Sequence, residues 1–262
     1  MYPRTDHLAD QPILDVQNLD VRYNGHFALE NITFRLHAGE RVAVVGPNGA
    51  GKSTLFKVVA GVLQPTSGEV AIYGSGPRGH VCIAYVPQRS QVDWSFPVSV
   101  ADVVMMGRIA KIGPLKWPKK RDWEFVQRAL ETVELSALAK RQIGQLSGGQ
   151  QQRMFIARAL AQEAELMLMD EPLTGLDAPS QEGILSLLDS LQRQNVTVMV
   201  ATHDLEQAAQ YFDRIMLLNH QLIGFGGPDE VLQPEKLLRA YGRKLHVDRE
   251  GLVLVDECCP PE

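Results

Sequence analysis

The chain has 262 residues, of which 45% are hydrophobic and 22% are charged, as is typical of a folded protein of one or two domains with a sizeable core. Its formal net charge is -5, so the composition gives no general basic surface for nucleic acid. No apolar run approaches the roughly 18 residues that cross a bilayer, and the start lacks the pattern of a secretory signal. We therefore expect a soluble protein of the cytoplasm.

Two kinds of strand pattern occur in the sequence. Residues 13–23 and 29–40 alternate polar and apolar side chains, which favours half-buried antiparallel strands. Residues 42–46 and 165–172 are almost continuously apolar, which indicates strands covered on both faces. Residues 179–194 supply a covering helix, because Ile184, Leu187, Leu188 and Leu191 share one face. The fold class expected is α/β with an antiparallel β flank.

The strand pattern fades between Gln88 and about residue 165. One helix face there carries Trp123, Val126, Leu130 and Val133. We predict an inserted helical subdomain at about 89–165. The later residues predict a strand at 196–201, a strand pair at 214–226, and a helix near 228–242.

Residues 46–54 read GPNGAGKST and match G-x-x-x-x-G-K-[ST] between a predicted buried strand and a predicted helix. Glycines let the backbone turn its N–H groups toward phosphate oxygens, and the helix N-terminus adds positive potential. Lys52 is then expected to reach the β and γ phosphates, and the Ser53 hydroxyl to bind Mg²⁺. A glycine-rich turn without a ligand is the alternative, and the complete strand, loop, lysine and helix argue against it.

Acidic and polar residues follow two of the apolar strands. Asp170 lies at the carboxyl end of its strand, where ligands bind in open α/β sheets, and it suits the Mg²⁺ shell. Glu171 comes next and suits activation of the attacking water. His203 follows another strand and is placed to bond the γ-phosphate. A lone histidine at a strand end is more often structural, so this assignment depends on the other motifs.

These motifs resemble the nucleotide-binding subunits of ATP-binding cassette (ABC) transporters, over nearly the whole chain to about residue 245. In the family's order, the resemblance identifies Walker A at 46–54, the Q-loop Gln88, the signature LSGGQ at 146–150, Walker B at 166–170, the catalytic Glu171, a D-loop ending at Asp177 and the switch His203. It implies a P-loop NTPase core with the antiparallel flank and the helical subdomain. The nucleotide-binding domain is expected at 1–245 and a tail at 246–262.

The resemblance also implies a site for ATP and Mg²⁺. Contacts with the nucleotide are implied for Tyr23, Gly46, Pro47, Asn48, Gly49, Ala50, Gly51, Lys52, Ser53, Thr54, Ser147, Gly148, Gly149, Gln150 and Asp177. Contacts with Mg²⁺ are implied for Ser53, Gln88 and Asp170, and catalytic roles for Gln88, Glu171 and His203. Tyr23 matches the aromatic residue that stacks on adenine, although a tyrosine in a strand is ordinary.

The signature predicts a dimer. Ser147, Gly148 and Gly149 resemble a second anion-binding helix terminus, which in this family closes over the ATP of a second copy. Two-fold symmetry then gives two composite sites per dimer, and loss of the γ-phosphate lets the dimer open.

Residues 86–108 and 218–232 resemble importer ATPases for manganese, zinc and iron. This implies import through separate membrane permease subunits, with a substrate-binding protein acting indirectly, and a peripheral position on the cytoplasmic face of the membrane. Trp94, Phe96 and Pro97 would help to form a groove for the permease; the alternative is that they belong to the subdomain core. The ATPase itself is not expected to contact the metal, because its seven histidines are scattered.

Other functions remain to be weighed. Within the family, the chain could serve another substrate or an exporter. From another class, a cassette ATPase could act on nucleic acid or ribosomes. Lys52 and Ser147 are too close in sequence for the long coiled-coil arms of chromosomal ATPases, and one cassette with negative net charge does not favour RNA. No nucleic-acid partner is expected.

The cysteines form no disulfide framework. Cys82 is expected to be a small core residue. His246, Cys258 and Cys259 are a hypothetical soft metal site in the tail, and the alternative is an incidental pair of cysteines.

Overall fold

The computed structural model describes residues 11–76, 83–113, 115–242, 245–248 and 251–254. Cys82, Cys258 and Cys259 lie outside the described residues, and so does the side chain of His246. Among the described helices, none is long and apolar enough to traverse a bilayer.

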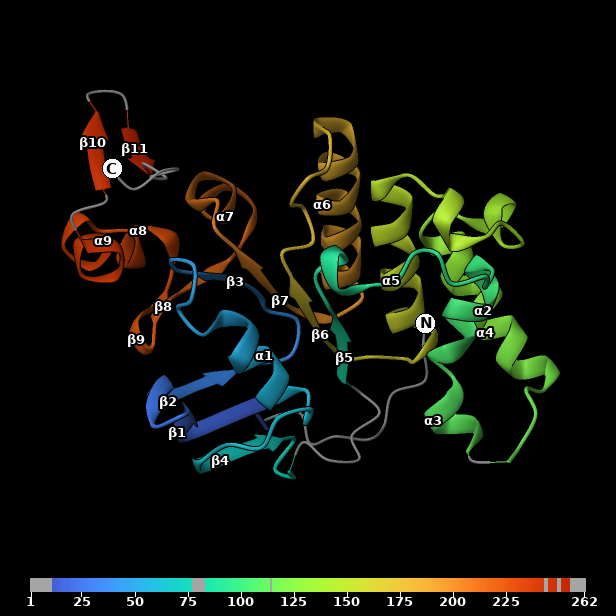
Figure 1. Cartoon of the computed structure of the whole chain (residues 1–262), viewed down its shortest axis with the longest axis horizontal. Coiled ribbons are helices and arrows are strands. Elements are labelled where there is room, and N and C mark those ends of the chain that lie inside the picture. Colours follow the sequence, from blue (N-terminus) through green and yellow to red (C-terminus); the bar gives the residue numbers. More distant parts are fainter. Residues whose placement is uncertain (1–10, 77–82, 114, 243–244, 249–250, 255–262) are drawn as a thin grey trace.

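A six-stranded sheet forms the centre of the molecule, in the order β5-β6-β7-β3-β8-β9 (Figure 1). Its strands are β3 (Arg41–Val45), β5 (Ile83–Val86), β6 (Leu166–Asp170), β7 (Thr197–Thr202), β8 (Arg214–Asn219) and β9 (Gln221–Gly226). All neighbouring strands are parallel except β8 and β9. The fully buried patterns of β6 and β7 agree with their continuous apolar sequences, because helices or a second sheet cover both faces.

The alternating segments near the start form the predicted antiparallel flank. β1 (Leu14–Tyr23) pairs with both β2 (His26–Leu36) and β4 (Ser67–Ile72) in a three-stranded sheet. Both pairs are antiparallel, and the apolar residues of β1 face inward while its polar residues face solvent. In Figure 1 this small sheet lies below α1 (Lys52–Val59).

Between β5 and β6 the described residues form helices and turns and no strand. The elements are η1 (Arg89–Gln91), α2 (Val100–Met106), α3 (Ile109–Ile112), α4 (Lys120–Thr132), η2 (Ser136–Leu138), η3 (Ile143–Gln145) and α5 (Gly148–Ala161). Figure 1 shows α2, α3 and α4 together on the side of α5 away from the central sheet. Val126, Leu130 and Val133 are buried as the periodicity predicts, whereas Trp123 is half exposed at the edge of that face.

Outside the central sheet, the residues after β6 form helices and a hairpin. The elements are α6 (Ala178–Arg193), α7 (Leu205–Tyr211), α8 (Pro228–Val231), α9 (Pro234–Tyr241) and a hairpin of β10 (Leu245–Asp248) with β11 (Gly251–Leu254). The single helix expected near 228–242 is two short helices. Pro234 starts the second one, because proline fits the first turn of a helix and not its interior.

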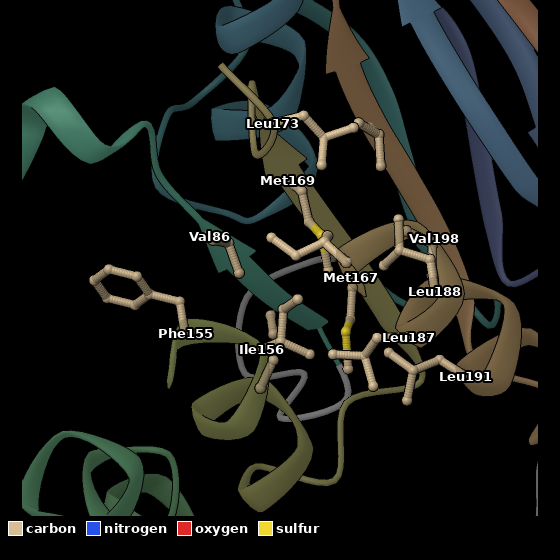
Figure 2. Close-up of a cluster of buried hydrophobic side chains, with 14 of the residues drawn as sticks. Val86, Phe155, Ile156, Met167, Met169, Leu173, Leu187, Leu188, Leu191 and Val198 are labelled. Carbon is tan, nitrogen blue, oxygen red and sulfur yellow. The ribbon is translucent and has the colours of Figure 1, made fainter. Parts of the chain in front are cut away.

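Two hydrophobic clusters lie on opposite faces of the central sheet, because successive strand residues point to opposite sides. Leu166 and Leu168 belong to the cluster shared with α1 and the antiparallel sheet. Met167 and Met169 belong to the cluster shared with α5 and α6. Figure 2 shows these two methionines with Ile156 of α5 and Leu187 of α6 around them. Each face of β6 is therefore fixed by packing, which holds the polar end of the strand in place.

Candidate nucleotide-binding site

Three central strands end side by side, so the residues that follow them lie at one edge of the sheet. Val45 of β3 pairs with Thr202 of β7, and Ala201 pairs with Asp170 of β6. The chain therefore leaves the sheet at neighbouring points. This juxtaposition brings together the three motifs that were expected to act on one phosphate group.

The loop between β3 and α1 has the backbone that a phosphate cradle needs. Gly46, Gly49 and Gly51 have φ of 156°, 84° and 98°. Gly51 lies in the left-handed region at the N-terminus of α1, and a β-carbon there would come within 2.5 Å of the Ala28 carbonyl oxygen. Only glycine tolerates both the turn and the close approach, and the first N–H groups of α1, as of any helix, have no acceptor within the helix.

Lys52 is folded into this loop. Its Nζ donates to the carbonyl oxygens of Gly46 at 2.5 Å and of Pro47 at 3.1 Å, and the residue is only 7% exposed. Burial lowers the pKa of Lys52, while the Glu171 and Asp170 carboxylates act in the opposite direction. The ammonium group therefore lies among weak carbonyl acceptors, which phosphate oxygens can replace.

Asp170 ends β6 and is 4% exposed. The Tyr85 hydroxyl of β5 donates to Asp170 Oδ2 at 3.3 Å. Burial raises the pKa of Tyr85, and the charge of Asp170 and this hydrogen bond raise it further. The phenol therefore stays protonated as a donor, and one oxygen of Asp170 is orientated by a group that the motifs did not indicate.

Glu171 turns away from the strand direction. Its φ is 48°, which is uncommon for a residue with a β-carbon, and its N–H donates to the Ala201 carbonyl at 3.1 Å. Its Oε2 accepts hydrogen bonds from Gln88 Nε2 and from the Thr174 hydroxyl, both at 3.2 Å. Asp170 and Glu171 are thus adjacent in sequence and held by different partners, so the two carboxylates are available for different tasks.

Arg89, the residue after Gln88, forms its hydrogen bonds with a different element. Arg89 donates to Gln151 Oε1 of α5 through Nε at 3.2 Å and Nη2 at 2.8 Å. Gln88 contacts the Glu171 carboxylate, so two consecutive residues join the predicted catalytic acid to the signature helix. The arginine was not predicted as a site residue, because its partner lies far along the chain.

His203 follows β7 and is exposed. Its neighbour Asp204 starts α7, accepts from the Gln207 N–H at 2.9 Å and donates its own N–H to the Thr202 hydroxyl at 3.1 Å. These bonds fix the backbone on both sides of the histidine and leave its imidazole at the edge of the sheet.

The start of β2 lies beside the phosphate loop. Gly51 lies against the Ala28 carbonyl, and His220, which also contacts Ala28, donates its N–H to the Ala50 carbonyl at 2.9 Å. Tyr23 ends β1 opposite His26 in the hairpin of β1 and β2 and is 49% exposed. An exposed ring near the phosphate loop is a suitable surface for a base to stack on.

The signature forms a capped helix start. The Ser147 hydroxyl accepts from the Gln150 N–H at 3.4 Å, and the Gln150 side chain accepts from the Ser147 N–H at 3.0 Å. A β-carbon on Gly149 would come within 2.7 Å of the Ser180 hydroxyl of α6. The glycine is therefore needed where the two helices begin side by side.

A cavity of about 300 Å³ opens beside this helix start, and we call it the signature hollow. It is lined by Glu134, Leu135, Ser147, Gly149, Gln150, Arg153, Pro179 and Ser180. Arg153 donates to the Glu134 carboxylate at 2.6 Å at its rim. In Figure 1, α1 and α5 lie apart on either side of β6. The signature hollow therefore does not border the chain's own phosphate loop.

Asp177 precedes α6 near the same hollow. Its carboxylate is exposed, and the Ser180 hydroxyl holds the pKa of Asp177 below its usual value. The D-loop and the signature are therefore neighbours.

Trp94 lies partly within the subdomain core. Its ring packs edge-on against Phe155 at 5.7 Å between centroids, and its Nε1 donates to the Arg89 carbonyl at 3.2 Å. Phe96 and Pro97 are exposed, so only these two present the surface expected of a groove.

The oxygen donors near Lys52 fit Mg²⁺. Asp170 offers a carboxylate, Ser53 a hydroxyl on the first turn of α1, and Gln88 an amide beside Glu171. Mg²⁺ prefers such hard ligands and is commonly held by one or two protein groups together with phosphate oxygens. Within the described residues no cluster of three histidine, cysteine or acidic side chains could hold a metal ion.

A phosphate loop, a strand-end aspartate followed by glutamate, and a capped signature helix define the class of protein as an ATP-binding cassette. Residues 29–174 match the family model described as ABC transporter. The chain belongs to the ABC transporter family, and it is an ATPase.

Curated relatives cover most of the chain. The manganese transport system ATP-binding protein MntB of Bacillus subtilis (strain 168) is 46% identical over 88% of this chain and 93% of its own length. The zinc transport system ATP-binding protein TroB of Treponema pallidum (strain Nichols) is 44% identical over 88% of each chain. The chelated iron transport system membrane protein YfeB of Yersinia pestis is 42% identical over 95% of this chain and 86% of its own.

Solved structures share the fold. A chain of a putative metal-chelate type ABC transporter in an inward-facing conformation aligns with a TM-score of 0.81 and 33% identity, covering 94% of this chain and 98% of that one. A dimeric ATP-binding cassette in a post-hydrolysis state, bound to ADP and Pi, aligns with a TM-score of 0.71 and 29% identity over 82% and 98%.

Proposed function

We propose that this ATPase powers import of a transition metal ion, manganese, zinc or iron, through a separate membrane permease. The observation that carries the ATPase part is the meeting of Lys52, Asp170 and Glu171 at one sheet edge. The relatives named for manganese, zinc and chelated iron transport support the choice of substrate class.

Residues 46–54 bind the phosphates of ATP in this proposal. The backbone N–H groups at the start of α1 hold the oxygens, and Lys52 moves from its carbonyl acceptors to the β and γ phosphates. Tyr23 stacks on adenine. Ser53, Asp170 and Gln88 hold Mg²⁺, which when bound offsets the negative charge of the phosphates.

Glu171 accepts the proton of the attacking water. Its hydrogen bond from Gln88 holds it in place, and it remains an acceptor after that bond forms because a carboxylate has several lone pairs. His203 donates to a γ-phosphate oxygen from the edge of β7. These assignments are supported by the positions of the three residues at the ends of adjacent strands.

The second half of the site comes from another copy of the chain. Ser147, Gly148, Gly149 and Gln150 bind the γ-phosphate of the partner's ATP through the N-terminus of α5, and Asp177 lies at the same interface. The solved dimeric cassette with ADP and Pi supports this arrangement. Hydrolysis removes the group that both copies share, so the dimer opens.

The subunit lies at the cytoplasmic face of the membrane, attached through the permease. Exposed Phe96 and Pro97 beside α2 provide a contact for it. The metal is recognised by the permease and by a substrate-binding protein that acts indirectly.

Transport by the reconstituted complex tests this function. The membrane partner is co-purified with the chain and placed in vesicles, and uptake of Mn²⁺, Zn²⁺ and Fe²⁺ is measured with and without ATP. We expect ATP-dependent uptake of at least one ion, and none with the Glu171→Gln subunit. Extrusion, or uptake of none of the three ions, would contradict the metal-import proposal and leave the ATPase assignment standing.

A further inference from the structure

One segment of the helical subdomain combines exposed apolar side chains with a cluster of positive charge. Residues 115–121 read LKWPKKR, and we call them the basic loop. It comprises the end of the connection between α3 and α4 together with the first two residues of α4, and it lies at the outer edge of the subdomain in Figure 1. It contains four basic residues and no acidic one, in a chain whose net charge is -5.

The apolar side chains of the loop have no protein cover. Leu115 is fully exposed and Trp117 is 88% exposed. Ile109, one short helix upstream, is 60% exposed, and Met106 at the end of α2 is 39% exposed. From the end of α2 to the loop, four large apolar side chains are therefore exposed.

The positive charges of the loop are not neutralised locally. Lys116, Lys119 and Lys120 are exposed. The adjacent acid, Asp122, accepts from the Lys119 backbone N–H at 2.9 Å and from Arg108 Nε at 3.3 Å. In the part of the chain that the structure describes, no acidic side chain forms an ion pair with these three lysines.

We propose that the basic loop binds the surface of an anionic phospholipid bilayer. Trp117 and Leu115 enter the interface between headgroups and acyl chains, and the lysine ammonium groups contact lipid phosphates. Protruding apolar side chains surrounded by lysines fit a flat, negatively charged surface, because such a surface offers both apolar depth and anionic headgroups.

This inference relies on the proposed function only to place the chain beside a membrane. A subunit attached to a permease has a bilayer beside it. The lipid contact would hold the helical subdomain at the membrane while the nucleotide site opens and closes.

Binding to protein-free vesicles tests the proposal separately from transport. The full chain is sedimented with vesicles of phosphatidylcholine alone and with vesicles containing about one third phosphatidylglycerol. We expect binding to the anionic vesicles only, with release at about 0.5 M salt because the charges are screened. Tryptophan emission should shift to shorter wavelength on binding.

Two loop variants define the contact. The triple variant Lys116→Gln, Lys119→Gln and Lys120→Gln should bind roughly 100-fold more weakly, at about fivefold for each lysine. Trp117→Ala should bind about tenfold more weakly and lose the emission shift. Circular dichroism and ATP binding should be unchanged in both, because the loop lies outside the nucleotide site.

A matched control removes three charges elsewhere. Lys140, Arg193 and Arg239 are exposed basic residues outside the basic loop, and each is replaced by Gln. This control should bind like the natural chain. Equal loss in the control, equal binding to neutral vesicles, or no binding to any protein-free vesicle would overturn the proposal. If the loop variants instead failed only to assemble with the permease, the loop would be a protein contact and the lipid proposal would be wrong.

Discussion

At the scale of single residues, Glu171 has a constrained position in the site. Its positive φ places it in a region that costs of order 1 kcal/mol for a residue with a β-carbon. The hydrogen bonds from Gln88 and Thr174 keep its carboxylate beside the Q-loop. Such strain at a predicted catalytic acid is consistent with a residue positioned for chemistry.

Replacing Glu171 by Gln tests its proposed role as the base. The glutamine side chain has the size and shape of glutamate but cannot accept the proton of the attacking water. Hydrolysis should therefore be at least about 100-fold slower. ATP affinity, measured by equilibrium titration, should stay within a few-fold of the original. As a control for the phosphate contacts, Lys52→Ala should lose ATP binding itself. Near-normal turnover by the glutamine variant would contradict the assignment.

Tyr85 is expected to position Asp170. Tyr85→Phe removes only the hydroxyl that donates to the carboxylate, so Asp170 should hold Mg²⁺ less well. We expect the Mg²⁺ concentration for half-maximal ATPase activity to rise about tenfold, with little change in the rate at saturating Mg²⁺. Thermal unfolding serves as the control, because loss of one hydrogen bond to a carboxylate costs about 1.5–3 kcal/mol and should leave the protein folded. An unchanged Mg²⁺ dependence would show that the hydrogen bond has no positioning role.

At the scale of elements, buried charge joins the helices of the subdomain. The Arg108 guanidinium contacts the carboxylates of Asp122 in α4 and of Glu163 after α5, and also the Ala161 carbonyl at 2.8 Å. It lies 4.1 Å from the centre of the Phe125 ring. A single side chain therefore connects the segment before α3 with two longer helices.

Arg108→Ala should strongly destabilise the fold. The Glu163 side chain is only 8% exposed, and removal of Arg108 leaves its charge with the partly exposed Lys111 alone. We expect the free energy of unfolding to fall by about 3–5 kcal/mol in urea denaturation. Arg193→Ala at an exposed position should change it by less than about 0.5 kcal/mol. Equal effects of the two substitutions would rule out a structural role for the buried network.

At the scale of the whole molecule, the two regions proposed to bind nucleotide lie apart. The phosphate loop lies on one side of β6 and the signature hollow on the other (Figure 1). One chain therefore cannot close both halves around the same nucleotide. We propose that association of two copies through a two-fold axis completes both sites at once.

Sedimentation of the Glu171→Gln variant with Mg-ATP tests this association. Slow hydrolysis should trap the closed state, so we expect dimers with ATP and monomers with ADP. Ser147→Arg in the same background should remain monomeric, because the larger side chain fills the signature hollow. Its ATP affinity should be retained, since Ser147 lies outside the chain's own phosphate loop. Dimers that form equally with and without Ser147 would place the interface elsewhere.

Motifs of short range could be predicted from the sequence because neighbouring residues determine them. GPNGAGKST predicts both a glycine turn and a helix start, and Lys52 and Gly51 are found there in the structure. The continuous apolar run ending in Asp170 predicts a buried central strand, and β6 is fully buried. The helix start predicted at Ser147, Gly148 and Gly149 likewise depends only on neighbouring residues, and α5 begins there.

Contacts between distant segments depend on tertiary packing and were not predicted. Tyr85 reaches Asp170 because β5 pairs with β6, and Arg89 reaches Gln151 because the helical insert folds back on the Q-loop. The exposure of Trp117 was equally undetermined, since a tryptophan between prolines and lysines has no periodic face. The sequence by itself determined the fold class, the phosphate loop and the helix start at the signature, because these follow from local backbone geometry and hydrophobic periodicity. Only the tertiary structure decided which side chains orientate the acids and which apolar residues stay uncovered, because these depend on how distant elements pack.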